Sequence, residues 1–235
     1  MNKAFKFGFT LAEVLITLSI IGVIAAMTLP ALVNRTNYAE NVVALKKVYE
    51  TLSQATYSLK SDYGSDMTGI LSTVADYDSE AMANIFIPKL RINKNCGLAS
   101  AKATGCFPNS TYKFLNDNND MNYSSTSSYS TILTNDNVSY AFAMTEADCS
   151  LDQRASVLSQ NPLKNICGRI YVDINGPYKG PAKWGRDMFQ FWVTKSGIYP
   201  RGSYPDNHGM MNCSSTSDYG AGCAGRVILE SAMNY

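Results

Sequence analysis

The stretch that decides the fold covers residues 6–33 and reads KFGFTLAEVLITLSIIGVIAAMTLPALV. Its last twenty residues, from Val14 on, carry no charged side chain. A helix of that length is about 30 Å long, which matches the hydrocarbon core of a bilayer. Two lysines precede the apolar run and no further basic residue follows before Arg35, which predicts a cytoplasmic N-terminal end. Glu13 stands where the run begins, and a carboxylate at membrane depth costs roughly 3 kcal/mol, so we expect it to have a partner.

A secretory signal peptide is the alternative interpretation of this segment. It would also have a basic start and an apolar run, with small residues at 25–26 or at Ala31 as the cleavage site. The apolar run is long for a signal peptide, and Glu13 at its start is unexpected in one. We therefore favour a retained membrane helix.

Residues Lys6–Ile16, KFGFTLAEVLI, closely resemble the prepilin cleavage motif of type IV pilins and type II secretion pseudopilins. The resemblance implies that a prepilin peptidase removes a leader, residues 1–8, by cutting between Gly8 and Phe9, and that Phe9 becomes N-methylated. Glu13 matches the family's glutamate. We expect its carboxylate to pair with the Phe9 amine of a neighbouring subunit and so fix the axial register of a filament.

A single long helix is predicted over residues 10–61. It contains Pro30, which matches the proline that commonly kinks this helix in the family. Residues 9–34 would form the transmembrane and filament-core part, and residues 35–61 an amphipathic continuation packed on a globular head of residues 62–235. A coiled coil is the alternative, but the stripe covers fewer than three heptads. The apolar stripe, with spacings of three and four, consists of Val42, Leu45, Tyr49, Leu52, Thr56 and Leu59.

The head is predicted to contain an antiparallel β-sheet, because its strand candidates follow one another without long helices between them. A short helix is expected over 79–87, a looped disulfide segment over 96–108, and an Asn/Ser-rich mobile surface loop over 116–130. The predicted fold class is therefore α+β and pilin-like, with the long N-terminal helix packed on the sheet and disulfide-bonded loops around it. The strand candidates are residues 130–133, 139–144, 169–174, 188–194 and 198–200.

The six cysteines all lie beyond residue 95, and their even number predicts up to three disulfides in an oxidising compartment. Six cysteines allow 15 pairings, and sequential pairing has the lowest loop-closure cost. Zinc is the alternative, but it usually needs close C-x₂₋₄-C pairs, which the sequence lacks. The disulfide candidates are Cys96, Cys106, Cys149, Cys167, Cys213 and Cys223.

A possible Ca²⁺ site lies in the stretch 173–202, which resembles the loop-and-hairpin region of many pseudopilin-like proteins. Some of these bind Ca²⁺ in a comparable loop, and the oxygens of Asp173, Asn175 and Asp187 could converge here as ligands. The stretch is not an EF-hand, because its twelfth position is Trp184. The alternative is that these side chains only cap turns of their own backbone.

Composition excludes several functions. The 20 basic and 19 acidic residues leave a net charge of +1, so nucleic-acid binding is not indicated. A single histidine and the lack of nucleotide-binding, serine-hydrolase or zinc-protease motifs predict a protein that is not an enzyme and requires no cofactor.

The resemblance implies a structural subunit of a type IV pilus-like or type II secretion pseudopilus filament. Such a subunit sits in the inner membrane with its head outside, and later in a periplasmic pseudopilus or a cell-surface filament. Its expected partners are the prepilin peptidase/methyltransferase, other pilin or pseudopilin subunits and an inner-membrane assembly platform. The alternative is a minor tip pilin whose head is an adhesion, sugar- or DNA-binding module. An enzyme domain on a pilin anchor is a third, weaker interpretation.

Overall fold

The computed structural model describes residues 10–98, 104–119, 128–154, 161–205, 212–216 and 218–235. By internal contacts the chain forms two units, Met1–Glu40 and Asn41–Tyr235, which are described separately. Gly8 and Phe9, the predicted cleavage position, lie outside the described residues. The same holds for residues 120–127 of the predicted Asn/Ser-rich loop.

The first unit contains the beginning of helix α1, which spans Leu11–Tyr63 and is assigned as α-helix without a break across Pro30. Within the described residues, one helical stretch is long and apolar enough to cross a membrane. It is Leu11–Leu29, with a mean hydropathy of 2.2 and none of its window buried. The kink expected at Pro30 stays a prediction.

The second unit begins with the rest of α1, which buries the predicted apolar stripe against the sheet. Leu45 and Leu52 are fully buried, and Tyr49 stacks on Phe191 of the sheet with ring centroids 6.1 Å apart. The helix ends at Tyr63, and the following Gly64 has φ +61°, a left-handed conformation that favours glycine after a helix. The amphipathic packing predicted from the sequence is therefore confirmed.

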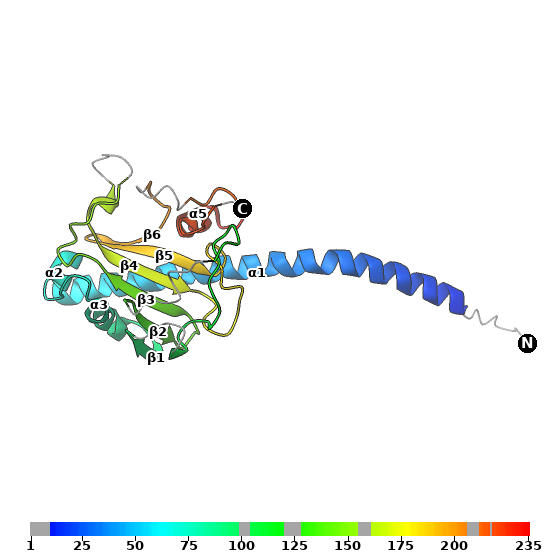
Figure 1. Ribbon diagram of the computed structural model, residues 1–235, viewed down its shortest axis with the longest axis horizontal. Helices are drawn as coiled ribbons and strands as arrows, with labels where there is room; N and C mark the ends of the chain where they lie inside the picture. The colour runs from blue at the N-terminus through cyan, green and yellow to red at the C-terminus, as the bar shows by residue number, and fades with distance from the viewer. Residues whose placement is uncertain (1–9, 99–103, 120–127, 155–160, 206–211, 217) are drawn as a thin grey trace, which may run out of the picture. The chain divides into compact units, whose positions relative to one another are not determined.

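The sheet has six strands in the order β1-β2-β3-β4-β5-β6, and every neighbouring pair is antiparallel. Figure 1 shows α1 passing behind the strands. Five of the six strands coincide with the predicted segments, although β4 begins three residues earlier than predicted. The α+β class with a helix on an antiparallel sheet is thus confirmed. The strands are β1 Ile92–Gly97, β2 Ser130–Thr134, β3 Ser139–Met144, β4 Ile166–Asp173, β5 Met188–Thr194 and β6 Gly197–Pro200.

Both faces of the sheet are covered. One face, which includes Phe142 and Ile170, packs with α1 in the main hydrophobic core. On the other face, Tyr171 and Met188 pack under the segments that carry Tyr112 and Trp184. The central strands are consequently buried along their whole length. This explains why their sequences are nearly continuous apolar runs and do not alternate between apolar and polar residues.

Short helices complete the head: α2 Met67–Leu71, α3 Ser79–Phe86, η1 Ile87–Lys89, η2 Pro162–Lys164 and α5 Cys223–Glu230. The predicted helix over 79–87 corresponds to α3. By contrast, β1 was not predicted, and its last two residues fall in the segment 96–108 that was expected to be a disulfide loop, because the polar sequence INKNCG gives no sign of a strand at the edge of the sheet. Its pairing with β2 contains two register shifts, so the strand lacks regular alternation.

Three disulfides join sequential cysteines: Cys96 to Cys106, Cys149 to Cys167, and Cys213 to Cys223. All six cysteines belong to the described residues, and none is free. The pairing with the lowest loop-closure cost is therefore the one the chain adopts, and a cysteine-bound zinc has no thiols available.

Candidate functional site

The first candidate site is the start of α1, where Thr10 and Glu13 hold each other. The Thr10 backbone N–H donates to Glu13 Oε2 at 2.9 Å, and the Thr10 hydroxyl donates to the same oxygen at 2.7 Å. In return, the Glu13 backbone N–H donates to Thr10 Oγ1 at 3.2 Å. Since α1 begins at Leu11, Thr10 occupies the N-cap position and Glu13 the third helical position, the arrangement of a capping box.

The capping role of Glu13 was not predicted, although the pattern Thr-x-x-Glu before an apolar run is its sequence signature. The carboxylate also lies at the helix N-terminus, where the helix dipole favours a negative charge. Within one chain, Glu13 thus already has a partner. The expected second partner, a neighbour's Phe9 amine, stays a prediction because Phe9 lies outside the described residues.

The apolar surface of α1 that follows is exposed within its own unit. Leu11 is 81 % exposed, Leu18 62 % and Met27 75 %. The hydroxyls of Thr17 and Ser19 donate to backbone carbonyls of the preceding helical turn at 2.9 Å and 2.8 Å, so they add no unpaired donor to this surface. A helix with exposed apolar side chains and internally bonded polar groups suits a bilayer or a bundle of similar helices.

The second candidate site is the predicted Ca²⁺ position at the β4–β5 connection. The structure brings Asp173, Asn175 and Asp187 together. Asp173 ends β4, and its backbone neighbour Ile174 donates to the Asp187 carbonyl at 2.9 Å. The Asn175 side-chain amide donates to the Gly180 carbonyl at 3.4 Å and also lies near the Asp187 carboxylate. Both carboxylates are fully buried.

The oxygens of these two carboxylates already accept hydrogen bonds. Asp173 Oδ1 accepts from the backbone N–H groups of Asn175 and Gly176 at 2.9 Å and 3.0 Å, and Asp173 Oδ2 accepts from the Tyr112 hydroxyl. Asp187 accepts from two further backbone N–H groups, that of residue 182 at 2.7 Å and that of residue 183 at 2.5 Å.

Electrostatics at this position favour bound protons. Burial raises the pKa of Asp187 to about 6, although the backbone donors and Asn175 oppose the shift. Burial and then the Asp187 charge raise the pKa of Asp173 well above its usual range. Two buried carboxylates this close cannot easily both be ionised, so the pair retains a proton near neutral pH.

The residues as arranged do not fit a Ca²⁺ ion. The carboxylate oxygens are engaged by N–H and O–H donors, and the Asn175 amide nitrogen donates to the Gly180 carbonyl. Among the described residues, no group of three or more His, Cys, Asp or Glu side chains could hold a metal. The contacts are those of side chains that cap turns. Calcium binding therefore stays a prediction of the sequence.

Comparison with known proteins bears on the N-terminal site. Residues 4–29 match the family model described as the prokaryotic N-terminal methylation motif. No curated protein and no solved structure gives a significant match. The matched residues contain Glu13 and the whole apolar stretch Leu11–Leu29, but none of the head.

The chain thus carries the cleavage and methylation motif of type IV pilins and pseudopilins, joined to an α+β head of the pilin-like kind. The motif supports this class of protein and points to a structural role. The motif and the apolar helix together fit a membrane-anchored pilin.

Proposed function

We propose that this protein is a structural subunit of a type IV pilus-like or type II secretion pseudopilus filament. Prepilin peptidase cuts after Gly8, Phe9 is methylated, and the subunit waits in the inner membrane with its head outside. An assembly platform then extracts it into a filament in which the apolar part of α1 forms the core. ATP hydrolysis, which this class of system needs, is supplied by a separate partner.

The observation that carries this proposal is that the matched motif coincides with an apolar helix whose side chains are exposed. The motif ends at residue 29, where the stretch Leu11–Leu29 also ends, and that stretch buries none of its window within the chain. The same helix buries its stripe from Val42 onward on the head. Apolar area left exposed at this density needs a lipid or protein partner. The bilayer is the lipid partner before assembly, and the helices of neighbouring subunits are the protein partner after assembly.

The capping box refines the role of Glu13 in this proposal. Thr10 engages one carboxylate oxygen, Oε2, and among the described residues no donor reaches Oε1 of Glu13. A methylated amine of a neighbouring Phe9 is a cation that can approach this oxygen. The cap then fixes the direction of the carboxylate, and the neighbour's charge compensates it in an apolar environment.

Mass spectrometry of the N-terminus from the native membrane tests the processing step. We expect a chain that begins at Phe9 and carries one methyl group. A chain that begins after residue 26 or 31 would instead indicate removal of a signal peptide, and the filament proposal would be withdrawn.

Glu13→Gln tests the charge pairing, because glutamine at the third helical position still completes a capping box. We expect the variant to insert in the membrane and to keep a folded head, but to form no filaments. Glu50→Gln, on the same helix beyond the apolar part, is the matched control and should assemble normally. Normal filaments of Glu13→Gln would contradict the pairing.

The alternative, a minor tip subunit with a binding head, has one observation in its favour: the head contains a polar groove, which is analysed below. The two roles differ in abundance. A major subunit makes up most of the mass of purified filaments, whereas a tip subunit is present in trace amounts.

A further inference from the structure

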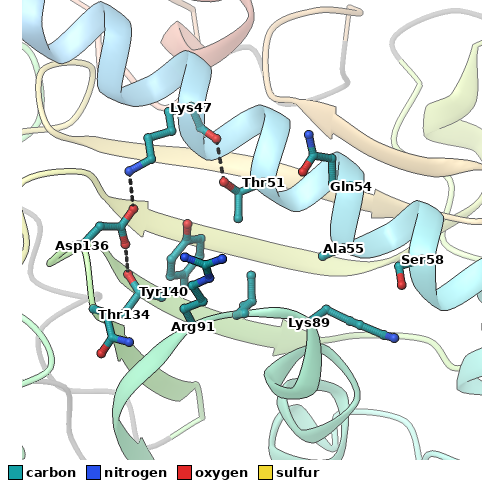
Figure 2. Close-up of a pocket in the computed structure, with 12 residues that line it drawn as sticks. Lys47, Thr51, Gln54, Ala55, Ser58, Lys89, Arg91, Thr134, Asp136 and Tyr140 are labelled. Atoms are coloured by element: carbon teal, nitrogen blue, oxygen red, sulfur yellow. Dashed lines mark hydrogen bonds and ion pairs between the residues drawn. The ribbon is translucent and has the colours of Figure 1, made fainter.

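A groove with a volume of about 630 Å³ opens along α1 on the head. One side is the helix face that carries Lys47, Thr51, Gln54 and Ser58. The other side consists of residues 89–91 before β1, the turn 134–136 between β2 and β3, and Tyr140 of β3 (Figure 2). We call this the basic groove.

Three cations and one carboxylate line the basic groove. Lys47 pairs with the carboxylate, Asp136, at 2.7 Å, and Lys89 pairs with Asp62 just outside. Arg91 is exposed, and among the described residues nothing accepts a hydrogen bond from its guanidinium or forms an ion pair with it. Arg91 therefore offers a positive charge and a planar set of donors that matches a carboxylate.

Tyr140 provides a second hydrogen-bond donor at the wall of the groove. The residue is only 2 % exposed as a whole, but its hydroxyl is not one of the buried polar atoms without a partner, so this oxygen reaches the surface of the groove. Burial, and to a lesser extent the Asp136 charge, raises the pKa of the Tyr140 phenol, so the group is a proton donor at neutral pH. Figure 2 shows both Tyr140 and Arg91 reaching from the sheet side toward α1. A hydroxyl at the wall of a groove can bond a ligand or water.

The rest of the basic groove is polar but uncharged. Gln54 and Ser58 lie about one helical turn apart on α1, and Asn135 faces them from the β2–β3 turn. Their amide and hydroxyl groups can both donate and accept. The volume is within the range of about 300 to 1,000 Å³ that is usual for small-molecule sites, and it exceeds what a lone carboxylate would fill.

We propose that the basic groove binds an acidic sugar, with its carboxylate between the Arg91 guanidinium and the Tyr140 hydroxyl and its hydroxyls on Gln54, Ser58 and Asn135. Lys47 neutralises Asp136, so the groove keeps a net positive charge for an anionic ligand. A sugar is favoured over an acidic side chain of a second copy, because the uncharged polar groups would then have nothing to bind. The inference does not depend on filament assembly, since binding is a property of the head.

The experiment is calorimetric titration of the full chain in nonionic detergent with D-glucuronate, with D-glucose and acetate as control ligands. We expect glucuronate to bind more tightly than either control, because only glucuronate has both the carboxylate and the hydroxyls. Arg91→Gln and Tyr140→Phe should each weaken glucuronate binding about tenfold or more, since each removes a hydrogen bond to a charged group. Lys164→Gln removes one exposed positive charge outside the groove and should leave the affinity unchanged.

The proposal is overturned if glucuronate does not bind the wild-type chain, or if glucose binds as tightly as glucuronate. It is also overturned if both groove variants bind glucuronate with the wild-type affinity. Equal binding of acetate would overturn the sugar assignment and indicate a simple carboxylate, such as an acidic side chain of another subunit. Tyr140→Phe changes one atom of a core residue, and the thermal unfolding of each variant verifies that the head is folded.

Discussion

The buried pair Asp173 and Asp187 makes the stability of the head depend on pH in a direction opposite to that of most carboxylates. The pKa of Asp187 rises from its ordinary value of 3.8 to about 6 in the folded chain. A carboxyl group with a raised pKa binds more protons when folded than when unfolded. Its contribution to stability is therefore fully present below about pH 3.8 and is lost as the pH rises through about 6.

The magnitude follows from the size of the shift. About two pKa units correspond to about 3 kcal/mol in total, of which about 2 kcal/mol falls between pH 4.5 and pH 8. Asp173 adds to this loss, because its pKa is raised well above the usual range. Exposed carboxylates with lowered pKa values, such as Asp152 with a pKa of about 2, titrate below this window and do not interfere.

The perturbation is Asp173→Asn. The asparagine oxygen can still accept from the backbone N–H groups of Asn175 and Gly176, and its amide can donate to the Tyr112 hydroxyl in place of the bond that Asp173 accepts. The variant thus removes one titrating group and keeps the hydrogen bonds. We expect it to be more stable than the wild type at pH 8 and to lose less free energy of unfolding between pH 4.5 and pH 8.

The assay is urea unfolding of the full chain in detergent, followed by tryptophan fluorescence at several pH values. Both tryptophans, Trp184 and Trp192, are buried in the head, so the signal reports unfolding of the head alone. Asp152→Asn is the matched control and should show the wild-type dependence above pH 4.5. A wild-type head that is as stable at pH 8 as at pH 4.5, or an Asp173→Asn variant with the wild-type slope, would refute the reasoning.

Three further predictions use the same unfolding assay. Leu52→Ala, at a fully buried position of α1, should cost about 2 to 5 kcal/mol, whereas Tyr57→Ala, at a position 78 % exposed on the same helix, should stay within about 0.5 kcal/mol of the wild type. Replacing both Cys149 and Cys167 by serine opens a cross-link with a sequence separation of 18 and should cost roughly 3 kcal/mol; a stability unchanged by this double substitution or by reducing agent would contradict that. Ca²⁺ added at pH 8 should raise the unfolding midpoint only if the Asp187 region binds it as the sequence predicts, and an unchanged midpoint removes the calcium site.

The long helix and most of the sheet could be predicted from the sequence, because burial in these elements produces a regular pattern of apolar residues. The stripe through Leu45 and Leu52 has the helical period, and the apolar runs of β3 and β5 reflect burial on both faces. The disulfides were open to 15 pairings on sequence grounds, and the adopted set is the one in which the shortest loops close.

Other elements escaped prediction because tertiary contacts override their local sequence. Helix α5 contains Gly225, which lowers helix propensity, but a Cβ there would lie 2.3 Å from the Ser203 backbone nitrogen. The close approach, with the Gly225 N–H donating to the Arg201 carbonyl at 2.7 Å, therefore requires glycine inside a helix. Strand β1 is polar because it lies at the edge of the sheet, and the Cys96–Cys106 cross-link holds its end.

The basic groove could not be read from the sequence at all. Gln54 and Ser58 look like the solvated face of an amphipathic helix, and Arg91 looks like a surface loop residue. Tyr140, in the middle of an apolar strand, looks like an ordinary core residue. Each has a sufficient structural explanation alone, and only the placement of α1 beside the β2–β3 turn brings them to one cavity. The fold thus places an exposed guanidinium, without an ion-pair partner among the described residues, beside a tyrosine hydroxyl that reaches the same groove, and these two donors are the ones that the proposed carboxylate would bind.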